Sequence, residues 1–204
     1  SIVLDPIGSR KNSGDNTPAL LTVDLVPGNT VSVYVSAKGG GSENKAKFAV
    51  LNPSDSVADW VVDTVEKLGA GWCPPGILGI GVGGSSDRAM AMAKKALNDP
   101  LDMQALLKNG PQNKSEELRI EIYERVNALG IGAQGLGGVT TVLDVKIKSF
   151  PTHAASLPIG LIPNCAATRH LHFTLDGTGV PNFETPDLAA WPEILLDEAN
   201  KNAR

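Results

Sequence analysis

The stretch from residue 69 to residue 88 constrains the fold of this chain more than any other. It holds a largely apolar run, Ile77 to Val82, between Cys73 and the glycines at 83–84. A short apolar run bounded by prolines and glycines predicts a buried strand. The Ser-Ser-Asp sequence that follows predicts the start of a helix. The stretch therefore predicts a strand with a cysteine loop at one end and a glycine turn with free backbone amides at the other.

Helical and strand patterns alternate along the rest of the chain. Apolar residues recur at helical spacing in three segments, 57–68, 87–97 and 115–129. Strand patterns occupy 19–26, 30–37, 139–150, 158–162 and 171–175. Pro27-Gly28-Asn29 separates the first two strands and predicts a hairpin. This alternation predicts an α/β fold, a layered domain with a mixed β-sheet flanked by helices.

Charge and cysteine content narrow the class of protein. The 204 residues include 22 acidic and 18 basic side chains, so the chain lacks the overall excess of positive charge that is typical of nucleic-acid-binding proteins. No stretch approaches the ~20 apolar residues of a membrane span. Two cysteines, Cys73 and Cys165, do not make a disulfide framework. We therefore expect a reducing compartment, the cytoplasm.

The two ends of the chain are typical of a piece of a longer protein. The sequence opens at Ser1 with residues that resemble the interior of a protein, and its last residues, 193–204, are charged with a helical pattern. We expect residues 1–192 to form part of one domain. We expect residues 193–204 to lead into a further domain outside this chain.

Cys73 and Cys165 each lie in a proline-containing loop beside an apolar strand. Free cysteine is often a buried, reduced thiol. Two thiolates cannot complete a structural zinc site, and an iron–sulfur cube normally uses more than two cysteines. From the residues alone, two interpretations stay open: core thiols, or ligands of a cluster with at least one further ligand outside this chain.

A glycine-rich segment and three histidines are further candidates. Residues 38–45 contain three consecutive glycines, which could direct backbone N–H groups at an anion or form a flexible loop. His153 could donate a proton or bind a substrate, or lie in a surface loop. We expect His170 and His172 to face solvent or a partner and not to belong to a site. The glycines of 79–84 lie inside the apolar run, which argues against a dinucleotide loop.

Six short motifs follow one another along nearly the whole chain. They are Asn12-Ser13-Gly14-Asp15-Asn16, Lys38-Gly39-Gly40-Gly41-Ser42-Glu43-Asn44-Lys45, Cys73-Pro74-Pro75, Gly130-Ile131-Gly132-Ala133-Gln134-Gly135, Pro151-Thr152-His153-Ala154-Ala155-Ser156 and Asn164-Cys165-Ala166. In this order they resemble the α region of the class I, iron–sulfur-dependent fumarate hydratases and the related L-tartrate dehydratases. The Lys-Gly-Gly-Gly-Ser and Asn-Cys-Ala-Ala stretches are more similar to the fumarases.

This resemblance implies a hydro-lyase that reversibly hydrates fumarate to L-malate, with L-tartrate dehydration as the alternative. It implies a [4Fe–4S] cluster in the full-length parent, held by three cysteines, with Cys73 and Cys165 as two of the metal ligands. The family's first ligand belongs to a Cys-Gln-Asp motif, and none precedes Cys73 in this sequence. We therefore expect the cluster to be absent or incomplete in this chain alone.

The resemblance also implies which residues contact the small dicarboxylate substrate. Gly41, Asn44 and Lys45 match the family's carboxylate-binding loop, and His153 matches its catalytic, substrate-contacting histidine. The family's base lies in a β domain or β subunit, so we expect this chain alone to be inactive. We expect the parent to be a homodimer with no nucleic-acid or membrane partner. A non-catalytic α/β binding or assembly module stays the alternative.

Overall fold

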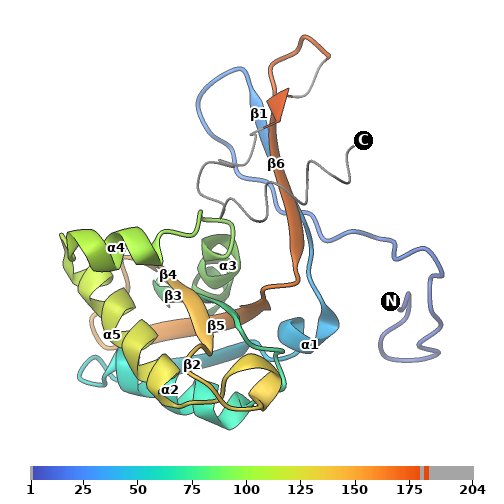
Figure 1. Cartoon of the computed structure of the whole chain (residues 1–204). Coiled ribbons are helices and arrows are strands. Elements are labelled where there is room, and N and C mark those ends of the chain that lie inside the picture. The colour runs from blue at the N-terminus through green and yellow to red at the C-terminus, as the bar shows by residue number, and fades with distance from the viewer. Residues whose placement is uncertain (1, 180–181, 184–204) are drawn as a thin grey trace, which may run out of the picture.

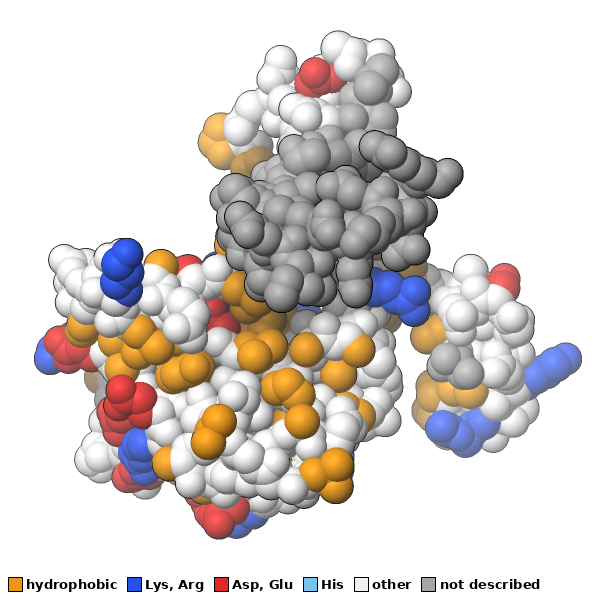
Figure 2. Space-filling view, viewed as in Figure 1, with side chains coloured by type: hydrophobic (Ala, Val, Ile, Leu, Met, Phe, Trp, Pro, Cys, Tyr) orange, Lys and Arg blue, Asp and Glu red, His pale blue; other side chains and the backbone are white. Residues whose placement is uncertain are grey.

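A four-stranded sheet with helices on both faces forms the body of the molecule. A three-stranded sheet, whose two long strands form a ribbon, and an N-terminal arm extend from this body (Figure 1), and Figure 2 shows the arm standing apart from the body in the same view. The computed structural model describes residues 2–179 and 182–183. The predicted helical tail at 193–204 lies outside the described residues, as does the predicted domain boundary at 192.

The sheet has the strand order β2-β5-β3-β4. Its strands are β2 (Lys47–Leu51), β3 (Gly76–Gly83), β4 (Val142–Phe150) and β5 (Leu157–Cys165). β5 runs antiparallel to both β2 and β3, whereas β3 and β4 are parallel. The predicted α/β architecture with a mixed sheet is therefore confirmed. The apolar run at 77–82 lies in one of the two inner strands, β3, which has a neighbour on each side.

Three helices, α2 (Val57–Leu68), α4 (Met103–Asn109) and α5 (Lys114–Ala128), pack with one face of the sheet around a single core. The Ser56 hydroxyl accepts the Asp59 N–H at 3.1 Å and caps the start of α2. The predicted helices at 57–68 and 115–129 are thus confirmed. The core side chains with no exposed surface include Val61, Val65, Trp72, Leu78, Ile80, Ile122, Val126, Val145, Ile159 and Leu161.

The opposite face of the sheet is covered by α3 (Ser86–Ala96), the helix predicted at 87–97. The approach is close because β3 presents glycines there. A Cβ added at Gly79 would lie 2.2 Å from the carbonyl oxygen of Ala93, and one at Gly81 would lie 2.0 Å from that of Ala89. The glycines of the central strand therefore serve helix packing.

The sequence patterns missed α4, and they missed two short turns, α1 (Gly40–Glu43) and η1 (Ala133–Gly135). The start of α4 is stabilised from a distant part of the chain. The Asp144 carboxylate accepts the backbone N–H groups of Asp102 and Met103 at 2.8 and 3.1 Å. Among the described residues, no helix is long and apolar enough to cross a membrane.

The predicted hairpin of strands 19–26 and 30–37 is wrong. Residues 19–26 form no strand. The second predicted strand exists as β1 (Val31–Ala37), but it pairs antiparallel with β6 (Arg169–Leu175). A third strand, β7 (Asn182–Phe183), adds two residues beside β6. The apolar alternation of β1 is therefore matched by a strand distant in sequence, and the local turn does not decide the pairing.

Candidate active site

The loops that carry the two cysteines meet at one end of the four-stranded sheet. β3 begins at Gly76, just after the Cys73 loop, and Gly76 is the register partner of Cys165 at the end of β5. The Ala166 N–H donates to the carbonyl oxygen of Pro75, with 3.1 Å between nitrogen and oxygen. Both cysteines are free and half-buried. The antiparallel pairing of β3 and β5 thus brings the two thiols to the same edge.

The Cys73 loop is held in a specific shape by its neighbours. Cys73 has a φ of +61°, in the left-handed region, and follows the fully buried Trp72. Gln134 donates to the carbonyl oxygen of Pro74 from both its backbone nitrogen, at 2.8 Å, and its side-chain amide, at 3.3 Å. The motif at 130–135 therefore supports the Cys73 loop, a role that the sequence analysis did not assign.

Backbone and side-chain hydrogen bonds order the Cys165 loop. The Ala167 N–H donates to the Cys165 sulfur at 3.4 Å, and the Thr168 N–H donates to the Cys165 carbonyl at 3.0 Å. The Thr168 hydroxyl also donates to the Asn164 side-chain oxygen at 2.7 Å. Hydrogen bonds to cysteine sulfur are a means by which proteins tune iron–sulfur sites. The loop thus already orients the Cys165 thiol in the free chain.

The glycine-rich turn of residues 38–45 lies against the Cys73 loop. A Cβ at Gly41 would lie 3.7 Å from the Cys73 sulfur and 3.8 Å from the Gly71 carbonyl oxygen. The side chain of Lys45 crosses the same loop, since its Cε and Nζ lie 2.5 and 2.9 Å from where a Cβ at Gly71 would be. Asn44 ends α1 and is exposed. Residues predicted to bind a carboxylate therefore gather beside a predicted metal ligand.

A group of three charges adjoins this edge. Lys38, whose side chain is 10% exposed, lies 3.2 Å from Glu43, which also pairs with Lys94 of α3. Burial lowers the pKa of Lys38, although the Glu43 carboxylate opposes the shift and Cys165 adds a smaller opposing effect. Burial alone would raise the pKa of Glu43, but Lys94 and Lys38 together lower it. Two cations against one anion leave one positive charge, which favours an anionic ligand nearby.

His153 does not join this group within the chain. It follows β4, whose last residue, Phe150, pairs with Gly83 at the far end of β3. The eight residues of β3 separate that end from the cysteine loops by on the order of 20 Å. His153 is exposed, and its Nδ1 accepts the Ala155 N–H at 3.1 Å. The structure thus separates His153 from Cys73 and Cys165 of the same chain.

The other two histidines lie on the ribbon. His170 stacks on Tyr34 with ring centroids 5.6 Å apart, and His172 Nε2 lies 2.7 Å from the Ser32 hydroxyl. Both histidines therefore belong to one face of the β1–β6 ribbon, and their rings contact ribbon side chains.

The cysteine edge fits part of an iron–sulfur site. Over residues 2–179 and 182–183, no group of three or more His, Cys, Asp or Glu side chains is arranged to hold a metal ion. The edge does offer two half-buried thiols on loops fixed by hydrogen bonds, with a nearby surplus of positive charge. These residues fit two of the three thiolate positions that the sequence resemblance implies.

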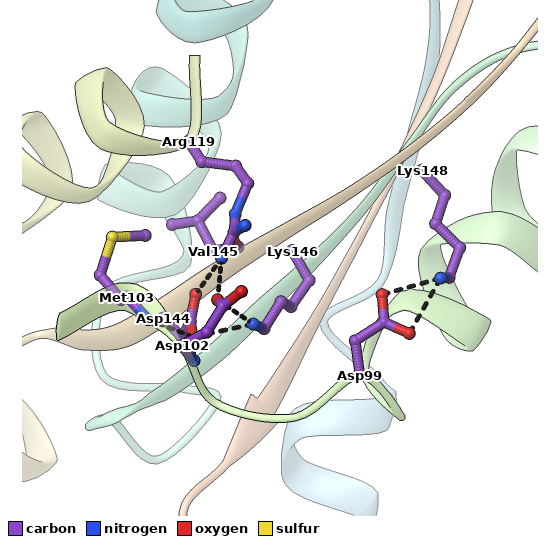
Figure 3. Close-up of polar contacts among 8 residues, drawn as sticks. All are labelled: Asp99, Asp102, Met103, Arg119, Asp144, Val145, Lys146 and Lys148. Carbon is purple, nitrogen blue, oxygen red and sulfur yellow. Dashed lines mark hydrogen bonds and ion pairs between the residues drawn. The ribbon is translucent and has the colours of Figure 1, made fainter. Parts of the chain in front are cut away.

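A second cluster of charges, around Asp144 of β4, is built differently (Figure 3). The buried Asp144 pairs with Arg119 and Lys146 at 3.1 and 3.0 Å, and Asp102 pairs with the same two cations. Two anions thus balance two cations. A surface hollow of about 450 Å³ opens beside them. Because these charges satisfy one another, the cluster is suited to holding α4 and α5 on β4, and we assign it no ligand.

Comparison with known proteins gives consistent matches. The family model described as "Fumarate hydratase (Fumerase)" matches residues 1–174. The chain is 38% identical over 167 residues to a protein of Methanocaldococcus jannaschii named "Putative L(+)-tartrate dehydratase subunit alpha", covering 78% of this chain and 56% of that protein. It is 31% identical over 173 residues to "L(+)-tartrate dehydratase subunit alpha" of Escherichia coli K12, covering 82% and 54%. The chain thus spans about half the length of these relatives.

Proposed function

Because the chain belongs to the fumarate hydratase (Fumerase) family, we propose that it forms part of a hydro-lyase acting on a four-carbon dicarboxylate. On fumarate, such an enzyme adds a proton and a hydroxyl group across the carbon–carbon double bond and yields L-malate. The observation that carries the proposal is the meeting of Cys73, Cys165 and the Gly41 turn at one end of the sheet.

In this proposal, Cys73 and Cys165 hold a [4Fe–4S] cluster together with one cysteine from another part of the parent protein. The hydrogen-bonded loops around both thiols and their partial exposure support this role. When bound, the cluster supplies a Lewis-acidic iron for a substrate hydroxyl and carboxylate. The chain's own contribution is to present two thiolates with little rearrangement.

The turn at 38–45 binds one substrate carboxylate in this proposal. The Lys45 ammonium beside Gly71 offers a positive charge, and the absence of a side chain at Gly41 leaves space next to the Cys73 sulfur. Asn44 adds an exposed amide at the end of α1. Lys38 is held by the Ser42 hydroxyl at 2.8 Å and by Glu43, so it acts through the local field and not by direct contact.

His153 requires a second polypeptide copy in order to take part. Its distance from the cysteine edge of its own chain is far longer than a hydrogen bond, which ends near ~3.2 Å. We propose that His153 contacts substrate bound at the cysteine edge of another copy. A β domain or β subunit, consistent with relatives that are named alpha subunits, would supply the base.

A second candidate substrate is L(+)-tartrate. The names of the relatives favour tartrate, whereas the description of the matching family favours fumarate. Both substrates present two carboxylates on a four-carbon chain, so the Lys45 turn suits either. Specificity then depends on groups that meet the second and third carbons.

The test uses the full-length parent with its β partner, reconstituted anaerobically with iron and sulfide. Fumarate, L-malate and L(+)-tartrate are assayed separately. We expect Cys73→Ser and Cys165→Ser each to remove the cluster's visible absorbance and nearly all activity. We expect Lys45→Met to raise KM at least tenfold, as the loss of one charge-assisted contact predicts, ~1.5–3 kcal/mol. Lys114→Met is the matched control, since Lys114 is exposed at the start of α5, a helix that Figure 1 places across the body from α1.

Two results would overturn the proposal. One is unchanged iron content and turnover in both cysteine variants, which would show that neither thiol holds the cluster. The other is a fully reconstituted protein that hydrates or dehydrates none of the three compounds. Turnover of tartrate alone would select the second candidate substrate.

A further inference from the structure

The loop of residues 151–156, which carries His153, crosses the end of the inner strand β3. β4 ends at Phe150 and β5 begins at Leu157. In the strand order β2-β5-β3-β4, these two strands lie on opposite sides of β3. Neighbouring strands lie about 4.8 Å apart, so the loop covers on the order of 10 Å across the sheet. The crossing brings the loop to the turn at Gly83 and Gly84, where β3 leads into α3.

That turn directs a backbone carbonyl at the loop. Gly83 and Gly84 have φ values of +90° and +70°, in the left-handed region that glycine adopts without strain. The Thr152 hydroxyl donates to the carbonyl oxygen of Gly84, with 3.0 Å between the two oxygens. This bond joins residues 68 positions apart in the sequence. It therefore ties the loop to the body at the residue next to His153.

A cation–π contact holds the beginning of the loop. The guanidinium carbon of Arg88 lies 4.4 Å from the centre of the Phe150 ring, within the ~6 Å over which such contacts are attractive. Gly84 leaves space for this pair, since a Cβ there would lie 2.7 Å from Arg88 Cγ and 3.8 Å from Phe150 Cδ1. The loop is thus held by a ring contact at Phe150 and by a hydrogen bond at Thr152.

Hydrogen bonds inside the loop orient the imidazole ring of His153. The Ala155 N–H donates to His153 Nδ1 at 3.1 Å, and the Ser156 N–H donates to the His153 carbonyl oxygen at 3.0 Å. A neutral imidazole carries a proton on one ring nitrogen and a lone pair on the other. Because Nδ1 accepts a hydrogen bond, the proton of the neutral ring is on Nε2. The exposed ring therefore offers an N–H donor at Nε2.

We propose that this loop fixes His153 as a hydrogen-bond donor through Nε2, and that Thr152 is the residue that positions it. The inference rests on the proposed function, in which His153 contacts the substrate. A carboxylate only accepts hydrogen bonds, and a hydroxyl oxygen can also accept one. A donor at Nε2 therefore suits either oxygen group of a four-carbon hydroxy acid.

The assignment separates His153 from the catalytic base. A general base needs a free lone pair within hydrogen-bond reach of the proton that it removes. The lone pair of the neutral His153 ring is on Nδ1, where it accepts the Ala155 N–H. His153 thus keeps its proton and binds a substrate oxygen, while a group outside this chain removes the proton. Position then matters, because a displacement of about 1 Å can lower a rate on the order of 10²-fold.

The first experiment distinguishes a donor from a base in the full-length parent with its β partner. His153→Gln supplies an amide N–H that donates but cannot act as a base, whereas His153→Leu supplies neither function. We expect kcat/KM to fall about tenfold or more for His153→Leu, the effect of losing one hydrogen bond to a charged group, and less than about threefold for His153→Gln. Equal losses in the two variants would assign His153 as a base and overturn the inference.

The second experiment tests Thr152 as the positioning residue. Thr152→Val removes the hydroxyl and keeps the shape of the side chain, whereas Thr152→Ser keeps the hydroxyl. Thr178→Val is the matched control, since the Thr178 hydroxyl donates to Asp176 in an exposed turn after β6, in the other sheet. We expect kcat/KM to fall about threefold or more for Thr152→Val, to return to within about twofold of wild type in Thr152→Ser, and to be unchanged in Thr178→Val.

NMR of the ring nitrogens gives a readout that does not depend on turnover. The parent is labelled with ¹⁵N-histidine and kept free of iron, and the resonances that His153→Gln lacks are those of His153. Their chemical shifts show which ring nitrogen carries the proton. We expect the proton on Nε2 in the wild type and a mixture of both tautomers in Thr152→Val. Circular dichroism checks that each variant is folded.

Two further results would overturn the inference. A proton on Nδ1 in the wild type would contradict the assigned donor. A Thr152→Val variant with wild-type kcat/KM and a single tautomer would show that Thr152 does not position the ring. Failure of the proposed function gives a different result, a reconstituted parent that turns over none of the three compounds. The NMR measurement needs no substrate, so it decides the orientation of His153 in that case as well.

Discussion

Replacing Asp144 by Asn is expected to cost the chain a large part of its stability. Asp144 has no exposed surface and receives four polar contacts, two from backbone N–H groups and two from Arg119 and Lys146. Asparagine keeps the shape of the side chain but removes its charge. Lys146, whose side chain is 4% exposed, then shares the half-exposed Asp102 with Arg119.

The magnitude follows from the number and burial of these contacts. Hydrogen bonds to a charged group contribute ~1.5–3 kcal/mol each, and breaking a buried ion pair costs ~3–5 kcal/mol. Asparagine retains one acceptor, and Asp102 still offsets part of the remaining positive charge. We therefore expect Asp144→Asn to lower the free energy of unfolding by about 3 kcal/mol. At ~2–4 °C per kcal/mol for a chain of this size, the melting temperature falls by roughly 6–12 °C.

Urea unfolding followed by tryptophan fluorescence measures this loss, because Trp72 is fully buried in the core. Asp63→Asn on α2 is the control. This substitution removes the i,i+4 ion pair between Asp63 and Lys67, whose side chains are 55% and 72% exposed respectively. It should lower the free energy of unfolding by only ~0–1 kcal/mol. If Asp144→Asn costs no more than this control, the buried charges do not stabilise the fold, and the structural role assigned to them is wrong.

Two further predictions test packing and acid stability. Gly81→Ala should lower the free energy of unfolding by about 2–3 kcal/mol, because its Cβ would lie 2.0 Å from the Ala89 carbonyl oxygen. The control is Gly40→Ala, whose Cβ would have no atom within 4 Å. In the same urea assay the control should change the free energy of unfolding by less than ~1 kcal/mol. Burial alone would raise the pKa of Asp102, but hydrogen bonds from Arg119 and Lys146 lower this pKa below its usual value of 3.8. The ionised Asp102 therefore stabilises the folded chain above pH 3.8, and this stabilisation is lost as the pH falls through the lowered pKa. Asp102→Asn should therefore flatten the fall in stability between pH 5 and pH 2, and an unchanged slope in acid titrations followed by circular dichroism would contradict this.

Local sequence patterns predicted the elements whose stability is largely local. α2, α3 and α5 each have apolar residues at helical spacing, and this spacing reports directly which side of a helix is buried. The run at 77–82 likewise predicted a buried strand, and β3 is one of the two strands of the four-stranded sheet with neighbours on both sides. The cap at Ser56 could be predicted because it bonds a backbone group only three residues away.

Local patterns failed wherever the stabilising partner is distant in sequence. The start of α4 is capped by Asp144, about 40 residues later, and no local residue predicts that bond. β1 has the alternation of a strand but gives no information on its partner. The turn at 27–29 suggested a neighbour in sequence, whereas the actual partner, β6, lies more than 130 residues away.

The same distinction holds for the candidate site. The motifs in the sequence were enough to single out Cys73, Cys165, the turn at 38–45 and His153, because the chemistry of thiols, glycines and imidazole is a property of the residues themselves. Which of them meet was decided by strand direction. β5 runs antiparallel to β3 and returns Cys165 to the end where Cys73 lies, whereas β4 runs parallel to β3 and carries His153 to the opposite end. Strand direction is set by nonlocal hydrogen bonds and core packing, so only the tertiary structure could separate the histidine from the cysteines.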